Sequence, residues 1–249
     1  MVLLAGRRIL AGVDLTLRRG AHVALVGPNG SGKSTLLRAL KGMEPFEGGS
    51  VWVDDVPVAA CDPAVGLVFA NPEDQGVSPI VEDDVAFGLE NLGRPPEEIG
   101  RRVEEALRLV GLWEHREAPI HTLSGGQAQL LALGSVLALG ARYLLLDEAT
   151  SMLSPWDREA LFVTLEALRR QGVGVLHVTH QPEEVLWAGE VLALETGSIR
   201  FRGSPSAFFR WPECPWSAPE YFELSEALSG EGGRCPSYGD LCRWLGRES

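Results

Sequence analysis

Lysine is nearly absent from this sequence. Only Lys33 and Lys41 occur among 249 residues, and arginine supplies the remaining positive charge. Because 34 acidic residues outnumber 22 basic ones, the formal net charge is −12. Such a chain lacks the basic footprint of a nucleic-acid-binding protein, so we expect no nucleic acid among its partners.

Cysteine is scarce as well. The four cysteines are Cys61, Cys214, Cys235 and Cys242. They form no CxxC pair and have no histidine at metal-ligand spacing, which favours free thiols in a reducing compartment over disulfides or a zinc site.

Long apolar runs are also missing. The longest, Leu130–Leu146, is interrupted by two glycines and an arginine, so it is too short and broken for a membrane span. No charged-then-apolar leader opens the sequence. We therefore expect a soluble protein of the cytosol, where it can dock on a membrane partner.

The sequence does contain an alternation of strand and helix patterns. Short apolar runs predict buried strands at residues 21–27, 51–55, 65–69, 143–148, 173–180 and 191–195. Helices are predicted at 33–40 and 155–171. Strands that are apolar on both faces and alternate with helices indicate an α/β fold with a parallel sheet covered on both sides.

Two segments depart from this alternation. Apolar residues recur at helical spacing over about residues 72–139, which predicts a helical subdomain inserted into a domain spanning 1–202. From Gly203 the composition shifts to Pro, Gly, Trp and Cys, which we interpret as a C-terminal extension of residues 203–249. Its aromatic residues fit a subunit contact or a small satellite core equally well.

A glycine-rich stretch lies between the first predicted strand and the first helix. GPNGSGKST has the spacing of a P-loop in the strand–helix context that a P-loop requires. Its glycines let backbone N–H groups turn inward on an anion, and the helix adds its positive end. Lys33 can reach the β- and γ-phosphates, and the Ser34 hydroxyl is placed to bind Mg²⁺. The predicted ATP-binding residues are Gly27, Pro28, Asn29, Gly30, Ser31, Gly32, Lys33, Ser34 and Thr35.

Three polar side chains lie at the carboxyl ends of two later predicted strands. LLLDE ends in Asp147 and Glu148, and LHVTH ends in His180. Adjacent acids are costly to bury unless charge or solvent meets them, and this edge of a parallel sheet is where ligands bind. We predict that Asp147 and Ser34 hold Mg²⁺, that Glu148 polarises the attacking water, and that His180 holds the γ-phosphate and this water. Glu148, His180 and Lys33 are the candidate catalytic residues.

A second anion-binding motif lies in the helical segment. LSGGQ begins a helix in which Ser124 is a good cap and two glycines expose backbone amides. One chain cannot easily fold this motif onto its own P-loop, whereas two chains placed head-to-tail can.

In their order these motifs resemble those of ABC-type ATPase subunits, over about residues 21–196. NPEDQ and VEDDVAFGLENLGRPPEEI further resemble the ATPases of energy-coupling factor (ECF) importers of vitamins or metal ions such as cobalt and nickel. The resemblance implies a P-loop core, ATP and Mg²⁺ as ligands, hydrolysis that powers transport, and a homo- or heterodimer with two ATP molecules between its subunits. Ser124, Gly125, Gly126 and Gln127 would contact the partner's ATP. The dimer would drive a membrane coupling subunit and a substrate-binding membrane subunit.

Three features depart from the family pattern. Ala70 stands where the family has a glutamine whose amide reaches Mg²⁺ and the water, Ser154 replaces an aspartate, and the first twenty residues contain no aromatic side chain to stack on adenine. Losing one amide beside the metal costs roughly ten- to a thousandfold in rate. We therefore expect a slow or partner-dependent ATPase.

Two alternatives stay open. One is a nucleotide-binding regulatory subunit with negligible hydrolysis, paired with an active ATPase. The other is a soluble ATPase of translation or DNA repair, which the acidic charge and the single nucleotide domain disfavour.

Overall fold

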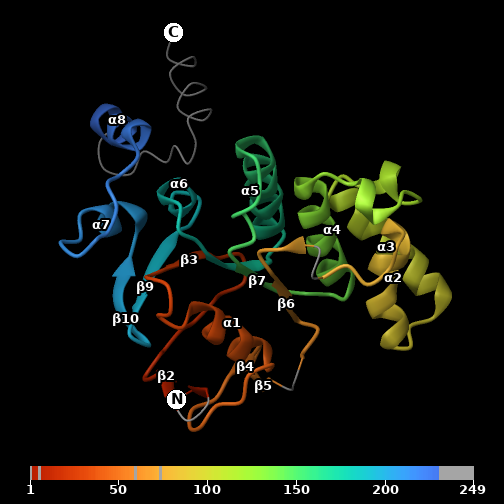
Figure 1. The fold of residues 1–249 in the computed structure, drawn as a ribbon, viewed down its shortest axis with the longest axis horizontal. Coiled ribbons are helices and arrows are strands. Elements are labelled where there is room, and N and C mark those ends of the chain that lie inside the picture. The colour runs from red at the N-terminus through yellow and green to blue at the C-terminus, as the bar shows by residue number, and fades with distance from the viewer. Residues whose placement is uncertain (1, 5–6, 59–60, 73–74, 230–249) are drawn as a thin grey trace.

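The structure, a computed structural model, describes residues 2–4, 7–58, 61–72 and 75–229. Its centre is a six-stranded sheet in the order β10-β9-β3-β8-β7-β6 (Figure 1). These strands are β3 (His22–Val26), β6 (Val65–Val68), β7 (Tyr143–Asp147), β8 (Gly174–Val178), β9 (Glu190–Glu195) and β10 (Ser198–Gly203).

Five of these strands run parallel, as predicted, whereas β10 runs antiparallel to β9. No strand was predicted at β10, which forms this antiparallel edge. Only Thr196 and Gly197 separate the two strands, and a loop that short can join only an antiparallel hairpin.

Helices cover both faces of the sheet. They are α1 (Lys33–Lys41) on one face, and α5 (Pro155–Arg170) and α6 (Pro182–Val185) on the other (Figure 1). Alternate strand residues face the two sides. Leu25 and Leu145 pack with Leu37 of α1, whereas Leu144 packs with Phe162 of α5. All five of these side chains are buried, so the sheet has an apolar core on each face.

The segment between β6 and β7 is helical, as predicted. It contains α2 (Val81–Asn91), α3 (Pro96–Leu109), the 3-10 helices η2 (Trp113–His115) and η3 (Ile120–Thr122), and α4 (Gly125–Ala138). Val81, Val85 and Leu89 recur on one face of α2 and are buried together with Leu107 of α3. Helix α4 contacts α2, α3, α5 and β6, so it links this layer to the edge of the sheet.

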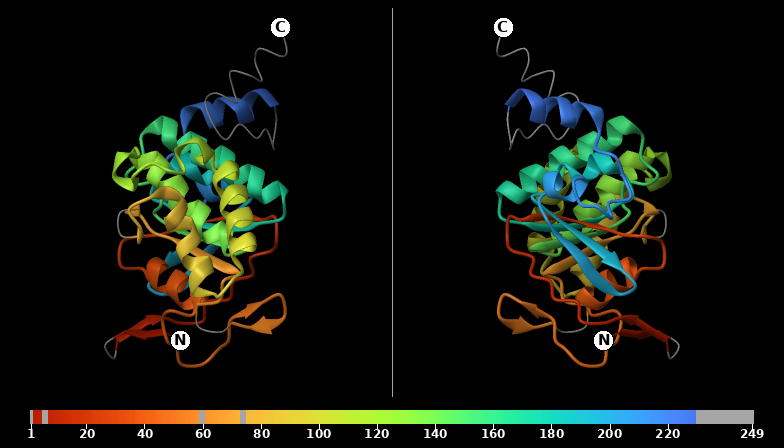
Figure 2. Two further views of the ribbon diagram at one scale, coloured as in Figure 1. Left: turned by 90° about the vertical axis from the view of Figure 1, so that its right-hand side faces the viewer. Right: turned by 90° about the vertical axis from the view of Figure 1, so that its left-hand side faces the viewer.

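Two small antiparallel hairpins lie outside the main sheet, at the same end of the molecule (Figure 2). They are β1 (Val2–Leu4) with β2 (Arg7–Leu10), and β4 (Trp52–Val53) with β5 (Val56–Pro57). The prediction of a strand over residues 51–55 is therefore right for only two residues, and that strand lies outside the main sheet. Asp54 and Asp55 adopt φ values of 46° and 64°, which turn the chain back at once.

After β10 the chain forms α7 (Pro205–Phe209) and α8 (Glu220–Ser229). Phe208 is fully buried against Ala24 and Val26 of the sheet, and Trp211 and Trp216 pack on the same cluster. This packing favours the satellite core over the subunit contact for these aromatic residues. A domain boundary at residue 203 stays a prediction, and the remainder of the predicted extension, 230–249, lies outside the described residues.

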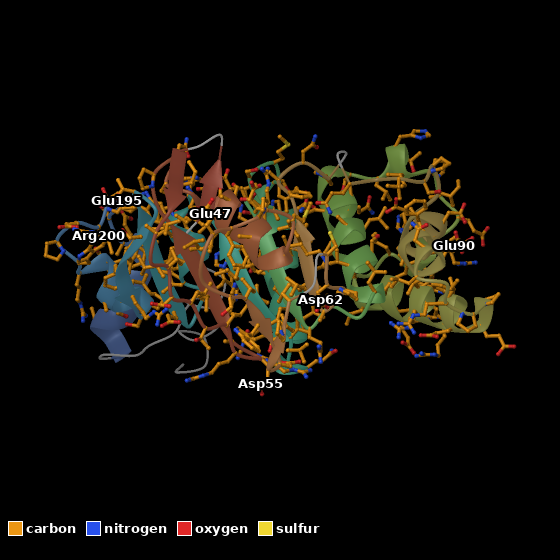
Figure 3. The ribbon with its side chains drawn as sticks, turned by 90° about the horizontal axis from the view of Figure 1, so that it is seen from below. Glu47, Asp55, Asp62, Glu90, Glu195 and Arg200 are labelled. Carbon is orange, nitrogen blue, oxygen red and sulfur yellow. The ribbon has the colours of Figure 1, made fainter. Side chains whose placement is uncertain are left out.

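The surface and the cysteines can be compared with expectation only in part. Cys61 and Cys214 are free thiols, whereas Cys235 and Cys242 lie outside the described residues. Five labelled acids are spread along the side of the molecule shown in Figure 3, from Glu195 to Glu90. No helix in the described ranges is long and apolar enough to cross a membrane.

Candidate functional site

The parallel register aligns the carboxyl ends of the three central strands. Asp147 of β7 pairs with Val178 of β8, and Leu25 of β3 pairs with the same valine. The residues that directly follow these strands therefore meet at one edge of the sheet. They are the P-loop from Gly27, Glu148, and the Thr179–His180 pair.

The glycines of the P-loop are required by close approach and by positive φ. A Cβ on Gly27, whose φ is 149°, would lie 2.1 Å from the backbone oxygen of Leu194. A Cβ on Gly32, whose φ is 106°, would lie 2.7 Å from Leu10. No other residue fits either position, and the loop can therefore turn its amides toward an anion at the start of α1.

Both lysines of the chain are turned inward. Lys33 Nζ donates hydrogen bonds to the carbonyl oxygens of Gly27 at 2.9 Å and Pro28 at 3.1 Å. Burial lowers the pKa of the Lys33 ammonium. Lys41 Nζ donates to two other carbonyl oxygens, those of Asp62 and Val65, at 2.8 and 2.6 Å. Only Lys33 lies in the P-loop, where its ammonium can exchange carbonyl oxygens for phosphate oxygens.

The predicted metal ligands are brought together. Ser34 Oγ donates to Asp147 Oδ1 at 2.9 Å, at the N-terminal end of α1. Burial raises the pKa of Asp147, and the Ser34 hydrogen bond opposes that shift. Within the described residues no group of three or more His, Cys, Asp or Glu side chains could hold a metal ion. A hydroxyl and a carboxylate fit Mg²⁺, which takes few protein ligands and completes its shell with phosphate and water oxygens.

Glu148 and His180 also meet. His180 Nε2 lies 2.9 Å from Glu148 Oε1, and each side chain is about one third exposed, at 35% and 36%. Glu148 has a φ of 54°, which is uncommon for a residue with a side chain and costs of order 1–3 kcal/mol. The backbone of Glu148 is thus strained, while its carboxylate is partly exposed to solvent and pairs with a histidine. This environment suits proton transfer rather than packing.

The LSGGQ motif begins α4 as predicted. Ser124 Oγ accepts the Gln127 N–H at 3.2 Å, and Gln127 Oε1 accepts the Ser124 N–H at 2.9 Å, which forms a capping box. A Cβ on Gly126 would lie 2.5 Å from Asp157 Oδ1 of α5. Helix α4 packs on α2, α3, α5 and β6, whereas the P-loop helix α1 packs on β2, β6 and β7. Within the described ranges, α1 and α4, which follow the two anion-binding motifs, are not among the pairs of elements that pack together.

The position of Ala70 is flanked by two glutamines that are already engaged. Gln75 Oε1 accepts the Phe69 N–H at 2.5 Å, and Gln129 Nε2 donates to the Phe69 carbonyl oxygen at 3.0 Å. Gln75 therefore uses its amide oxygen to hold the backbone next to Ala70.

Ser154 caps the N-terminal end of α5. Its Oγ accepts the Asp157 N–H at 3.2 Å at the start of α5 and donates to Asp157 Oδ2 at 2.7 Å. The Asp157 carboxylate therefore lies at the start of α5, next to the LSGGQ helix.

Sequence reasoning missed the buried polar residues behind this edge. Thr150, Thr179, Glu184 and Gln129 are all at most 6% exposed. The sequence did offer one signal for these residues, since they are polar residues within segments that are otherwise apolar or that contain a motif. Their mutual contacts depend on tertiary packing and could not be inferred.

A groove of about 650 Å³ lies beside the site, between α2, α4 and the segment Gly76–Pro79. Val77, Phe87 and Met152 line it and are 59%, 44% and 69% exposed. Exposed apolar side chains that line a groove are typical of a protein contact.

Comparison with known proteins adds to this geometry. A family model described as ABC transporter matches residues 10–151. The energy-coupling factor transporter ATP-binding protein EcfA1 of Caldanaerobacter subterraneus is 38% identical over 240 residues, covering 92% of this chain and 87% of that protein. The cobalt import ATP-binding protein CbiO of Syntrophus aciditrophicus is 41% identical over 199 residues, or 78% and 71% of the two chains. The solved structure of cbiO1 from Clostridium perfringens, part of the ABC transporter complex cbiONQ, has a TM-score of 0.75 at 30% identity, and the match covers 81% of this chain and 84% of that one.

Proposed function

This chain belongs to the ABC transporter family as an ATPase subunit of the ECF and CbiO importer type, and from that premise we propose that it hydrolyses ATP to power uptake of a vitamin or a metal ion of the cobalt and nickel class. One observation carries the proposal: a P-loop lysine, a Ser–Asp pair and a Glu–His pair lie at the same edge of the sheet.

The chain's own residues then divide the work. The P-loop amides and Lys33 hold the phosphates, Glu148 accepts a proton from the attacking water, and His180 orients that water toward the γ-phosphate. Mg²⁺, held by Ser34 and Asp147, would neutralise charge on the β- and γ-phosphates. His180 must exchange its contact with Glu148 for one with phosphate when ATP binds.

A second ATPase subunit completes the site. The separation of LSGGQ from the P-loop supports a head-to-tail dimer, in which Ser124–Gln127 of each chain meet the other chain's ATP. The capping box uses the N–H groups of Ser124 and Gln127 but not those of Gly125 and Gly126 at the start of α4, where the helix dipole favours a phosphate. The partner can be a second copy or a related ATPase.

A membrane coupling subunit is the occupant that we propose for the groove at α2 and α4. Its exposed apolar lining and its position directly after β6 support this, since a segment docked there would push on the strand that leads to Ala70. The ATPase would thereby lie at the cytoplasmic face of the membrane, with a substrate-binding membrane subunit choosing the solute.

Phosphate release measures this function directly. The purified protein should release phosphate from Mg-ATP, and Glu148→Gln should lower kcat by about 10²- to 10³-fold while its affinity for ATP is retained. Nucleotide binding without hydrolysis above the Glu148→Gln blank would instead establish the regulatory alternative.

The Ala70→Gln variant tests whether the missing amide limits the rate. We expect roughly a tenfold or greater rise in kcat with an unchanged Kd for ATP. Equal rates for the two proteins would mean that Ala70 is neutral. Ala70→Val, which adds bulk without an amide, is the matched control and should bring no gain.

A further inference from the structure

A buried carboxylate lies behind the Glu148–His180 pair. Glu184, on the short helix α6, is 1% exposed. Its Oε2 accepts a hydrogen bond from the hydroxyl of Thr179. The Thr150 side chain also acts on this carboxyl and opposes the rise in its pKa. Its Oε1 also lies 3.3 Å from Arg158 Nε in an ion pair. One carboxylate therefore contacts side chains from three separate segments.

Each of these segments carries a part of the site or leads into it. Thr179 directly precedes His180, and its hydroxyl also accepts the N–H of Gln181 on the other side of the histidine, at 2.9 Å. Thr150 lies two residues after Glu148, in a buried position. Arg158 stands in the first turn of α5, directly after the loop of residues 151–154.

Packing alone does not account for an ionisable group in this place. A buried carboxylate loses its hydration, and an apolar side chain of similar volume would fill the same space without that cost. Burial accordingly raises the pKa of Glu184, while its hydroxyl and arginine partners oppose the shift. Hydrogen bonds and ion pairs depend on direction and distance. The partners of Glu184 therefore fix how the segments that carry them are oriented, which an apolar contact cannot do.

We propose that Glu184 is a positioning residue for ATP hydrolysis, which orients His180 beside Glu148 by holding the Thr179–His180 segment through the Thr179 hydroxyl. The inference rests on the proposed function. It assigns to Glu184 an effect on kcat and none on nucleotide binding, since Glu184 contacts no P-loop residue in the described part of the chain.

The Glu184→Gln variant tests this, with Glu183→Gln as the matched control. Glu183 is the preceding residue of the same helix and is exposed, so both variants remove one carboxylate from α6. Glu184→Gln should lower kcat about tenfold or more, with the Kd for Mg-ATP and the KM within about twofold of the parent protein. Glu183→Gln should leave all three unchanged.

A double-variant cycle separates positioning from a general loss of structure. In a His180→Ala background Glu184→Gln should lower kcat by less than about threefold, because the group that it orients is gone. A purely structural role would make the two effects multiply. Equal tenfold effects of Glu184→Gln in both backgrounds would overturn the proposal.

A second pair of variants decides the matter if Glu184→Gln does not fold. Thr179→Ser keeps the hydroxyl and should retain kcat, whereas Thr179→Val removes it and should lower kcat severalfold at constant Kd. Equal rates for these two variants, or a Glu184→Gln protein as fast as Glu183→Gln, would refute the role of Glu184 in a working ATPase. Absence of hydrolysis in the parent protein, measured against Glu148→Gln, is a separate result that would overturn the proposed function and this inference together.

Discussion

Two histidines three residues apart, His177 and His180, have opposite environments. His177 lies within β8 and is 2% exposed, and its Nδ1 lies 2.9 Å from Nε2 of His22 on the neighbouring strand β3. His180 lies just past the end of the strand, is 35% exposed and meets the carboxylate of Glu148. One imidazole belongs to the core and the other to the site.

The environments of the two histidines differ because one ring is buried beside another histidine and the other is partly exposed beside a carboxylate. The pKa of His22 is lowered to about 3 and that of His177 is also lowered, chiefly because burial disfavours the charged ring. Both rings pack against Phe162, which adds to their desolvation. The pair is thus a neutral part of the core, whereas His180 lies beside a carboxylate and is partly open to solvent, so its ring can change partners.

Removing His177 should have the largest effect. His177→Ala deletes a buried ring and leaves His22 without its hydrogen-bond partner, so the free energy of unfolding should fall by about 2–4 kcal/mol. Urea denaturation measures this, with the exposed His121→Ala as control. Activity per folded molecule should persist. A variant with unchanged stability but lost hydrolysis would reverse the roles that we give to the two histidines.

Removing His180 should do the opposite. His180→Ala should lower kcat by about 10²-fold, equivalent to about 2.7 kcal/mol in the barrier, because the water and the γ-phosphate lose their orienting group. Its unfolding midpoint should stay close to that of the parent protein. Steady-state phosphate release and urea titration on the same sample give both numbers. A large drop in stability would place His180 in the core as well.

Lowering the pH should reduce the free energy of unfolding through the buried histidines, without any mutation. The folded-state pKa of His22 is about 3 and its unfolded value is near 6.5, so below pH 6.5 the unfolded chain binds more protons. The contribution of His22 to stability is complete above pH 6.5 and is lost as the pH falls, by about 2 kcal/mol at pH 5. His177 acts in the same direction. Urea titrations at pH 7 and pH 5 measure the loss, and His22→Gln, with one titrating ring fewer, should lose less.

We expect the smallest effect from changing Phe162, the aromatic side chain that packs on the buried His22–His177 pair. Phe162→Leu keeps an apolar side chain but removes the ring that stacks near His22 and on Trp187, which should cost about 1 kcal/mol. Val163→Ala, the next residue of α5 and 56% exposed, is the control and should change little. If both variants lose the same stability in thermal unfolding, the Phe162 ring contributes no specific stabilisation.

The sequence predicted the parts of this molecule that depend on local pattern. The P-loop, the Ser124 cap, the helical insert and the polar ends of β7 and β8 all follow from spacing and from residues adjacent in the chain. The antiparallel β10 was missed because a polar edge strand carries little apolar signal. The contacts of Glu184 and the His22–His177 pair were missed because they join residues distant in sequence, and only the register of β3 against β8 brings those rings together.

The inward-facing lysines have a practical consequence for anyone who tries to capture assemblies of this protein. Crosslinkers and dyes that acylate side-chain amines have only two targets, Lys33 and Lys41, and both are held against backbone carbonyls. Such reagents will leave the arginine-rich exterior untouched, so carboxylate-directed coupling is the better choice there. The same scarcity turns an electrophilic nucleotide analogue into a nearly background-free reporter, because the amine that it should find first is the one in the phosphate-binding loop.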